Sequence, residues 1–224
     1  DTPMALTAEN IAEQYAVTQD EVDAFSLASQ HRWGAAHEAG YFAAELAPVT
    51  VKSRKGERVI DTDEHPRPQT TREGLAKLPK VFKRDGVIHA GAASGICDGA
   101  GALVMSSSTY AESKGLEPIA SLVSWGVTGC DPKVMGLGPV ESSKLALKRA
   151  GLTLDDMTLV EINEAFAPQV LGCAKALDID PARLNACGGA IALGHPLAAS
   201  GARITAHLIH SLKRQGGGFG LGSA

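Results

Sequence analysis

Apolar residues in the first forty positions recur at the spacing of amphipathic helices. Thr18 to Glu21 reads as a capping box, which predicts the start of a long helix that ends near Gly40. A shorter helix is expected before it, from an N-cap at Thr7 through Tyr15. The apolar stripe of the longer helix consists of Val22, Phe25, Ala28 and Trp33.

The next fifty residues are less regular. Valines and one isoleucine on either side of the turn Lys55–Glu57 predict two short strands, at Val49, Val51 and at Val59, Ile60. Residues 61–72 carry prolines and charges without periodicity, which indicates an ordered surface loop.

From residue 118 onward, apolar runs of strand length alternate with helical patterns. We expect strands at 119–125, 159–162 and 219–224, and helices at 139–150, 164–177 and 202–215, the second of them interrupted near Pro168. A buried strand at 102–106 and a short helix at 110–114 should precede them. This alternation predicts a layered α/β fold.

Composition limits the class of protein but does not indicate a function. The 224 residues are 44% hydrophobic with a net charge of −4, which suits a globular protein and gives no electrostatic reason to expect nucleic acid as a partner. No apolar run reaches the length of a membrane span, and no signal peptide is visible. Four cysteines lack metal-ligand spacing and read as reduced thiols of an intracellular protein, so we expect no metal site.

Two polar residues stand where an α/β protein places reactive groups. Asn163 follows a predicted strand, and His195 lies between Gly194 and Pro196 in a stretch of small residues, Asn185–Gly201. An imidazole exchanges protons near neutral pH, and an amide can hold a water or donate to an oxyanion. An equally ordinary interpretation makes His195 a satisfied turn histidine and Asn163 a helix cap.

The stretch Asn185–Gly201 resembles the histidine motif of the thiolase family, and Asn163–Ala167 resembles the family's second motif. Further stretches resemble the family in the same order along the chain: Pro3–Asn10, Asp61–Arg67, Ala90–Gly101 and Met135–Val140. The resemblance implies a thiolase-like fold, layered α-β-α-β-α and here partial. It divides the chain into a loop-domain remainder with segments that contact coenzyme A (CoA) (1–95), the last strand and helix of the N-terminal half (96–116), and an incomplete C-terminal domain (117–224).

The chain is most similar to the 3-ketoacyl-CoA thiolases. The resemblance implies cleavage of a 3-ketoacyl-CoA by CoA through a cysteine acyl-enzyme, giving acetyl-CoA and a shortened acyl-CoA, and the reverse Claisen condensation. CoA is then a substrate and no cofactor is bound permanently. The pathway is fatty-acid β-oxidation, and the assembly is a homodimer or homotetramer. The bacterial cytoplasm and the mitochondrial matrix are both open, and an acetoacetyl-CoA thiolase is an alternative.

The resemblance also implies roles for single residues. His195 would activate the nucleophilic cysteine and help to bind the thioester oxygen, while Asn163 would hold a water that completes the oxyanion hole. The remaining matches are Arg67 near the CoA nucleotide, Ala90 and Ser94 along the pantetheine arm, and Met4 and Met135 in the acyl pocket. Without the resemblance, Arg67 would read as a solvated side chain and the methionines as core residues.

The family's nucleophilic cysteine would lie before residue 1, and its second cysteine would follow Ala224 directly. We therefore expect a longer parent protein and no turnover by these 224 residues alone; a catalytically inactive CoA-binding subunit is the alternative. Cys187 could replace the nucleophile, but a buried small thiol is the simpler interpretation. His207 and His210 could bind a metal, although a solvated helix face fits them better. A dinucleotide site is disfavoured, because the glycines after Gly91 lack the required spacing.

Overall fold

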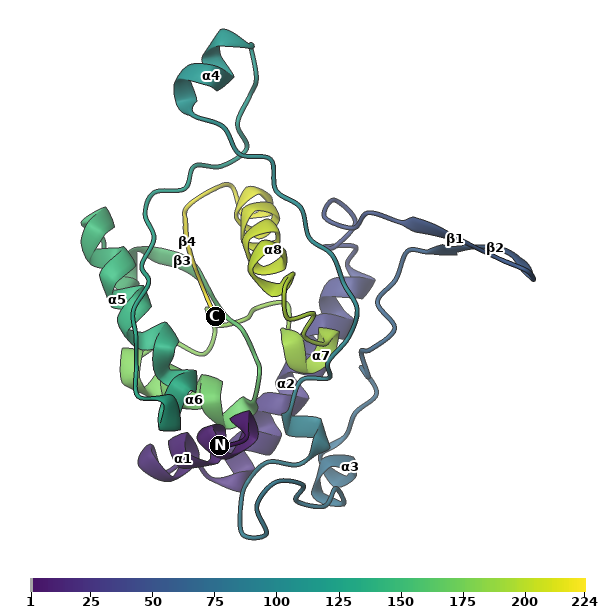
Figure 1. Ribbon diagram of the computed structural model, residues 1–224, viewed down its shortest axis with the longest axis vertical. Helices are drawn as coiled ribbons and strands as arrows, with labels where there is room; N and C mark the ends of the chain where they lie inside the picture. The colour runs from purple at the N-terminus through teal and green to yellow at the C-terminus, as the bar shows by residue number, and fades with distance from the viewer. Residues whose placement is uncertain (1) are drawn as a thin grey trace.

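The computed structural model describes residues 2–224 (Figure 1). The α-helices are α1 (Met4–Gln14), α2 (Gln19–Glu38), α3 (Arg72–Ala76), α4 (Ser108–Ser113), α5 (Gly138–Ala150), α6 (Ala167–Leu177), α7 (Ala190–Leu193) and α8 (Ser200–Arg214). The strands are β1 (Val49–Ser53), β2 (Gly56–Ile60), β3 (Met157–Ile162) and β4 (Phe219–Ser223). Short 3-10 turns are η1 (Ala90–Ala92), η2 (Pro132–Leu137) and η3 (Leu154–Asp156).

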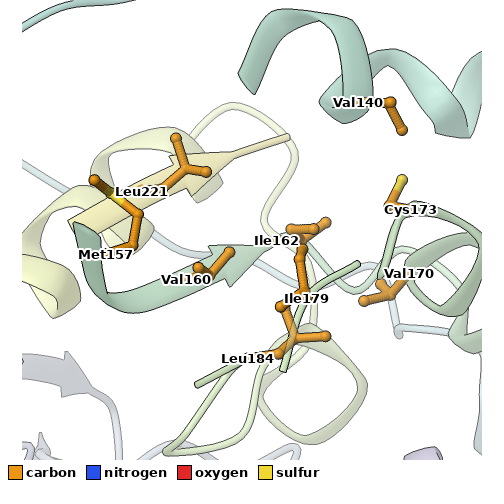
Figure 2. Packing of buried hydrophobic residues seen from close by; sticks show 9 residues of the cluster. All are labelled: Val140, Met157, Val160, Ile162, Val170, Cys173, Ile179, Leu184 and Leu221. Atoms are coloured by element: carbon orange, nitrogen blue, oxygen red, sulfur yellow. The ribbon is translucent and has the colours of Figure 1, made fainter. Parts of the chain in front are cut away.

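The centre of the molecule is a parallel pair of strands, β3 and β4, with helices on both faces. Side chains alternate along β3, so Val160 and Ile162 face α5 and α6 while Leu159 faces α8. Each face of β3 therefore belongs to its own hydrophobic cluster, and Figure 2 shows the larger one, on the side of α5 and α6. Its buried members are Val140, Met157, Val160, Ile162, Val170, Cys173, Ile179, Leu184 and Leu221. The predicted α/β layering is confirmed, with a buried strand whose carboxyl end carries Asn163.

The N-terminal helices pack beneath this sheet and follow the predicted capping box. The hydroxyl of Thr18 accepts from the backbone N–H of Glu21, and the Glu21 carboxylate accepts from the backbone N–H of Thr18 at 2.7 Å. Glu21 also forms a 2.8 Å ion pair with Lys175 of α6. The predicted start of α2 is confirmed, and the ion pair joins the first turn of α2 to α6.

Two helix starts were wrong in the sequence prediction. Helix α1 begins at Met4 after Pro3, and Thr7 lies inside it, where its hydroxyl donates to the Met4 carbonyl at 2.6 Å instead of capping the helix. Helix α6 begins at Ala167 and not at residue 164, so Pro168 lies in the first helical turn. Proline is tolerated there because the missing N–H would have no partner within the helix.

The predicted hairpin is confirmed. Strands β1 and β2 pair antiparallel with Thr50 opposite Val59, and the hairpin projects from the body of the molecule (Figure 1). Residues 49–59 of both strands are exposed. The hairpin therefore contributes nothing to the core around β3.

The strands expected at 102–106 and 119–125 are not formed. Residues 97–106 and 116–131 run as extended, mostly exposed segments that lead to and from α4 (Figure 1). A strand needs a neighbour to bond its backbone, and residues 2–224 present none to either segment. The short helix predicted at 110–114 is present as α4, shifted by about two residues.

Candidate active site

The backbone around His195 joins the two small-residue stretches of the chain. Gly194 adopts φ +86°, and a Cβ atom there would lie 2.6 Å from the Cys97 sulfur, so this turn requires glycine. The backbone N–H of His195 donates to the Gly95 carbonyl at 2.7 Å. His195 is therefore held on a fixed turn against residues 95–97.

The imidazole of His195 contacts a polar group on each side. Its Nδ1 lies 2.6 Å from the Ser200 hydroxyl, and its Nε2 lies 3.4 Å from Nδ2 of Asn163. Burial lowers the pKa of His195, and the nearby Arg203 guanidinium lowers it further. The ring is therefore neutral at physiological pH and able to accept a proton.

Asn163 is placed by the end of β3. Its backbone N–H donates to the Ser223 carbonyl of β4 at 2.9 Å, and its side chain is buried beside His195. Its Oδ1 has no hydrogen-bond partner among residues 2–224. A buried acceptor of this kind beside a neutral imidazole suits a water or a substrate group.

Glu164, the next residue, is completely buried and anchors the site. Its carboxylate accepts from the Ser29 hydroxyl at 2.6 Å, Nδ2 of Asn185 at 2.8 Å and the backbone N–H of Ile191 at 3.0 Å. Burial raises its pKa above the ordinary value, although the hydrogen bonds from Ser29, Asn185 and Ile191 oppose that rise. These contacts join α2, β3 and α7, so Glu164 fixes the position of Asn163 relative to the segment that carries His195.

A pocket of about 780 Å³ opens beside this anchor. Arg67, Ala90 and Ser94 line it together with Gly95 and Ile191. The hydroxyl and backbone N–H of Ser94 both donate to the Ala165 carbonyl, at 3.1 and 3.0 Å, two residues after Asn163. The structure thus brings three of the predicted CoA-contacting residues to one pocket and ties that pocket to the end of β3.

Arg67 is exposed at the pocket rim, but one of its terminal nitrogens is already in use. Nη1 donates to the carbonyls of Glu64, His65 and Pro66 at 2.6–3.0 Å. This side chain therefore holds its own loop in shape while the rest of the guanidinium faces solvent. The two interpretations of Arg67, solvated side chain and anion contact, are compatible in this geometry.

Met4 and Met135 do not line this pocket. Met4 is 52% exposed on α1 and Met135 is 42% exposed on η2, and these two elements pack against each other. Neither residue is in the core, so the core interpretation of the methionines is wrong for residues 2–224. Their place in an acyl pocket stays a prediction.

The remaining candidates of the sequence lie away from His195. Cys187 is buried in a cluster with Trp33 and Phe42, and its sulfur accepts from Arg214 at 3.6 Å. His207 is also buried and His210 is partly buried, so the expectation of a solvated helix face is wrong for His207. Within residues 2–224, no group of three histidine, cysteine, aspartate or glutamate side chains is arranged to hold a metal ion.

Sequence reasoning missed the residues that support the site. Ser29, Glu164, Asn185 and Ser200 are all buried and polar, and each bonds an element that carries Asn163 or His195. Asn185 and Ser200 stand within the same motif as His195, and Glu164 follows Asn163 directly, which was the available signal. Ser29 had none, because it sits in an ordinary helical pattern.

Comparison with known proteins places the chain in a family. The thiolase N-terminal domain matches residues 1–109 and the thiolase C-terminal domain matches residues 116–224. The mouse mitochondrial 3-ketoacyl-CoA thiolase is 54% identical over 99% of this chain and 56% of its own length. An acetyl-CoA acetyltransferase of Chromobacterium violaceum is 48% identical over 97% of this chain and 56% of its own length.

Solved structures agree with the sequence matches. The human mitochondrial 3-ketoacyl-CoA thiolase superposes with a TM-score of 0.92 at 49% identity, covering 99% of this chain and 56% of that one. The same human thiolase in complex with CoA gives 0.91 at 48% identity, covering 99% and 55%. The chain thus spans about half the length of these relatives and shares their fold. It belongs to the thiolase family.

Proposed function

We propose that the protein is a 3-ketoacyl-CoA thiolase, which cleaves a 3-ketoacyl-CoA with CoA to acetyl-CoA and a shortened acyl-CoA and runs the reverse Claisen condensation. The observation that carries this proposal is the contact between His195 Nε2 and Asn163 Nδ2 at 3.4 Å. Two motifs 32 positions apart (195 minus 163) supply it, and only the fold brings them together.

The pair fits acyl transfer. A neutral imidazole can take the proton of a thiol, and the resulting Nε2–H can donate to the oxygen of a thioester. Asn163 adds a polar side chain beside the imidazole, and its unbonded Oδ1 can hold a water molecule. That water can act, beside Nε2–H, as a second hydrogen-bond donor to the thioester oxygen. The thiol itself is the family's nucleophilic cysteine, which the resemblance puts outside residues 1–224.

The pocket lined by Ser94 and Gly95 suits CoA. His195 and Asn163 are not among its lining residues, but the His195 backbone N–H donates to the Gly95 carbonyl at its edge. Its volume of about 780 Å³ lies in the range of cofactor sites, and small residues such as Ala90 allow a narrow pantetheine chain to pass close to the backbone. Arg67 at the rim supplies positive charge for phosphate, and Ser94 supplies a hydroxyl. That a thiolase structure at 48% identity is a complex with CoA supports this assignment.

Identity favours the longer substrates over acetoacetyl-CoA. The mitochondrial 3-ketoacyl-CoA thiolase is 54% identical and the acetyl-CoA acetyltransferase 48% identical. An acetoacetyl-CoA thiolase is therefore the second candidate. A role in fatty-acid β-oxidation, a homodimeric or homotetrameric assembly, and a location in the mitochondrial matrix or bacterial cytoplasm belong to the same proposal. None of the helices formed by residues 2–224 is long and apolar enough to cross a membrane.

The test measures CoA-dependent cleavage of acetoacetyl-CoA and of a longer 3-ketoacyl-CoA by the full-length protein. We expect the longer substrate to react faster, and His195→Ala to lower kcat by about 100-fold or more. His210→Ala on α8 is the matched control and should keep the wild-type rate. Acyl-CoA binding without turnover by the wild type would contradict the proposal and favour an inactive CoA-binding subunit.

A further inference from the structure

Ser200 stands at the first position of α8, five residues after His195, and is 2% exposed. Its Oγ lies 2.6 Å from His195 Nδ1 and 3.2 Å from the Pro196 carbonyl oxygen. The hydroxyl thus touches the reactive imidazole on the side away from Asn163.

The two contacts of Ser200 determine which partner receives its single proton. The Pro196 carbonyl oxygen only accepts hydrogen bonds, and it also accepts from the backbone N–H groups of Ala199 and Ser200 at 2.8 and 3.0 Å. The Ser200 hydroxyl adds a third donor to this oxygen at 3.2 Å and offers its lone pairs to the ring. The ring then donates from Nδ1–H. Because a neutral imidazole carries one proton, Nε2 is left with a free lone pair.

The contact on the other side of the ring is compatible with the same tautomer. Nδ2 of Asn163 is a donor only, and it faces Nε2 at 3.4 Å. At 3.4 Å this contact is long for a hydrogen bond, so it leaves the Nε2 lone pair available to a thiol that approaches more closely. The backbone turn and the start of α8 hold both contacts in place.

We propose that Ser200 is a positioning residue that fixes His195 as the Nδ1–H tautomer and so aims an unprotonated Nε2 at the reacting thiol. The inference rests on the proposed function for its chemical meaning, while the tautomer itself is independent of activity. In the reaction, the thiol S–H bond breaks and an Nε2–H bond forms. This step leaves a thiolate and an imidazolium, and Ser200 Oγ stabilises the imidazolium because it still accepts from Nδ1–H.

The tautomer is read directly by nitrogen NMR on the full-length protein labelled with 15N-histidine, with His195→Gln used to assign the signals. We expect the wild type to show Nδ1 in the protonated range and Nε2 in the unprotonated range. In Ser200→Ala the bias should be lost, with the two signals moving toward each other or exchanging. Ser200→Thr keeps a hydroxyl and should restore the wild-type pattern.

Thr205→Val is the matched control, since Thr205 also donates to the carbonyl four residues earlier on α8, at 2.8 Å, but is exposed and touches no histidine. It should change neither signal. A protonated Nε2 in the wild type, or an unchanged tautomer in Ser200→Ala at an unchanged melting temperature, would overturn the role of Ser200.

Kinetics separate this inference from the proposed function. Ser200→Ala should lower kcat by about tenfold or more, with KM within about twofold, because the ring loses its preferred tautomer and not the CoA pocket. A loss confined to KM would overturn the positioning role. A wild type with the expected tautomer and no thiolase activity would contradict the proposed function alone.

Discussion

Polar side chains at the carboxyl end of β3 differ in whether their hydrogen bonds are complete. Glu164 uses its carboxylate for Ser29, Asn185 and Ile191, and such a saturated buried group stabilises a structure. Asn163, one residue earlier, keeps Oδ1 unbonded within residues 2–224. The residue with spare bonding capacity is therefore the one suited to chemistry, and its saturated neighbour holds it still.

A second buried cluster, on the α8 side of β3, makes stability depend on pH. His207 Nδ1 lies 2.9 Å from Glu45 Oε1, and its Nε2 lies 4.0 Å from Glu161. Burial alone would lower the pKa of His207, but hydrogen bonds with Cys187 and Glu45 and the charge of Glu161 raise it to about 10. The proton on His207 is thus bound more tightly in the folded than in the unfolded chain.

The sign of the pH effect follows from this difference. A histidine whose folded pKa is raised stabilises the protein fully below its unfolded pKa of about 6.5, and that contribution is lost as pH rises through 10. We expect the free energy of unfolding, measured in urea, to fall by about 2–4 kcal/mol between pH 7 and 10. Burial also raises the pKa of Glu161, to about 7, so its own effect lies mostly below this window.

His207→Asn should flatten the curve between pH 7 and 10, while His210→Asn on the same helix should leave it unchanged. An identical slope in His207→Asn and wild type would contradict the assignment.

The sequence suggested only a solvated His207, because a helical pattern does not reveal that Glu45, 162 positions away (207 minus 45), folds against it. His195 and Asn163 were predicted from motifs, but the groups that orient them are set by tertiary contacts.

At the scale of single elements, the capping box of α2 offers the most direct test. Thr18→Ala removes the hydroxyl that accepts from the Glu21 N–H and should lower the free energy of unfolding by about 1 kcal/mol. Thr50→Ala on the exposed hairpin strand β1 is the control and should change it by less than about 0.5 kcal/mol. Equal losses in both variants would show that the cap does not stabilise α2.

The elements predicted correctly are those whose signals are local. The α2 cap, the hairpin and the end of the helix predicted at 139–150 depend on neighbouring residues only; α5 ends at Ala150, and Gly151 follows it at φ +68°. The strands at 102–106 and 119–125 were wrong because apolar patterning reports a tendency to be buried, and burial needs a partner elsewhere in the fold. Thr7 was wrong because a threonine can bond a carbonyl within its own helix as well as cap one.

The molecule is well packed around β3, whereas the segments 97–106 and 116–131 are largely exposed to solvent. The segment 97–106 passes α8, and the segment 116–131 lies along α5, where Arg149 donates to the Trp125 carbonyl at 2.7 Å. Both segments leave apolar side chains exposed, among them Val104 and Val127. Exposed apolar patches mark interaction surfaces, and this chain spans 56% of the length of the mouse relative.

The two tryptophans report this contrast separately. Trp33 is 5% exposed beneath Phe42, while Trp125 is 66% exposed on the open segment. In the 224-residue chain, acrylamide should quench the fluorescence of Trp33→Phe, which retains Trp125, several times more strongly than that of Trp125→Phe. Equal quenching of the two variants would contradict the exposed position of Trp125.

The same substitution in the full-length protein tests what covers the open sides. The measured quantity is the difference in acrylamide-quenchable fluorescence between the wild type and Trp125→Phe. If residues beyond these 224 pack on segments 97–106 and 116–131, Trp125 is shielded, and this difference should be smaller than in the 224-residue chain. The exposed Tyr110→Phe on α4 is a control that alters an aromatic residue without touching either segment. A Trp125 signal as quenchable as in the 224-residue chain would mean that this side of α5 stays open to solvent.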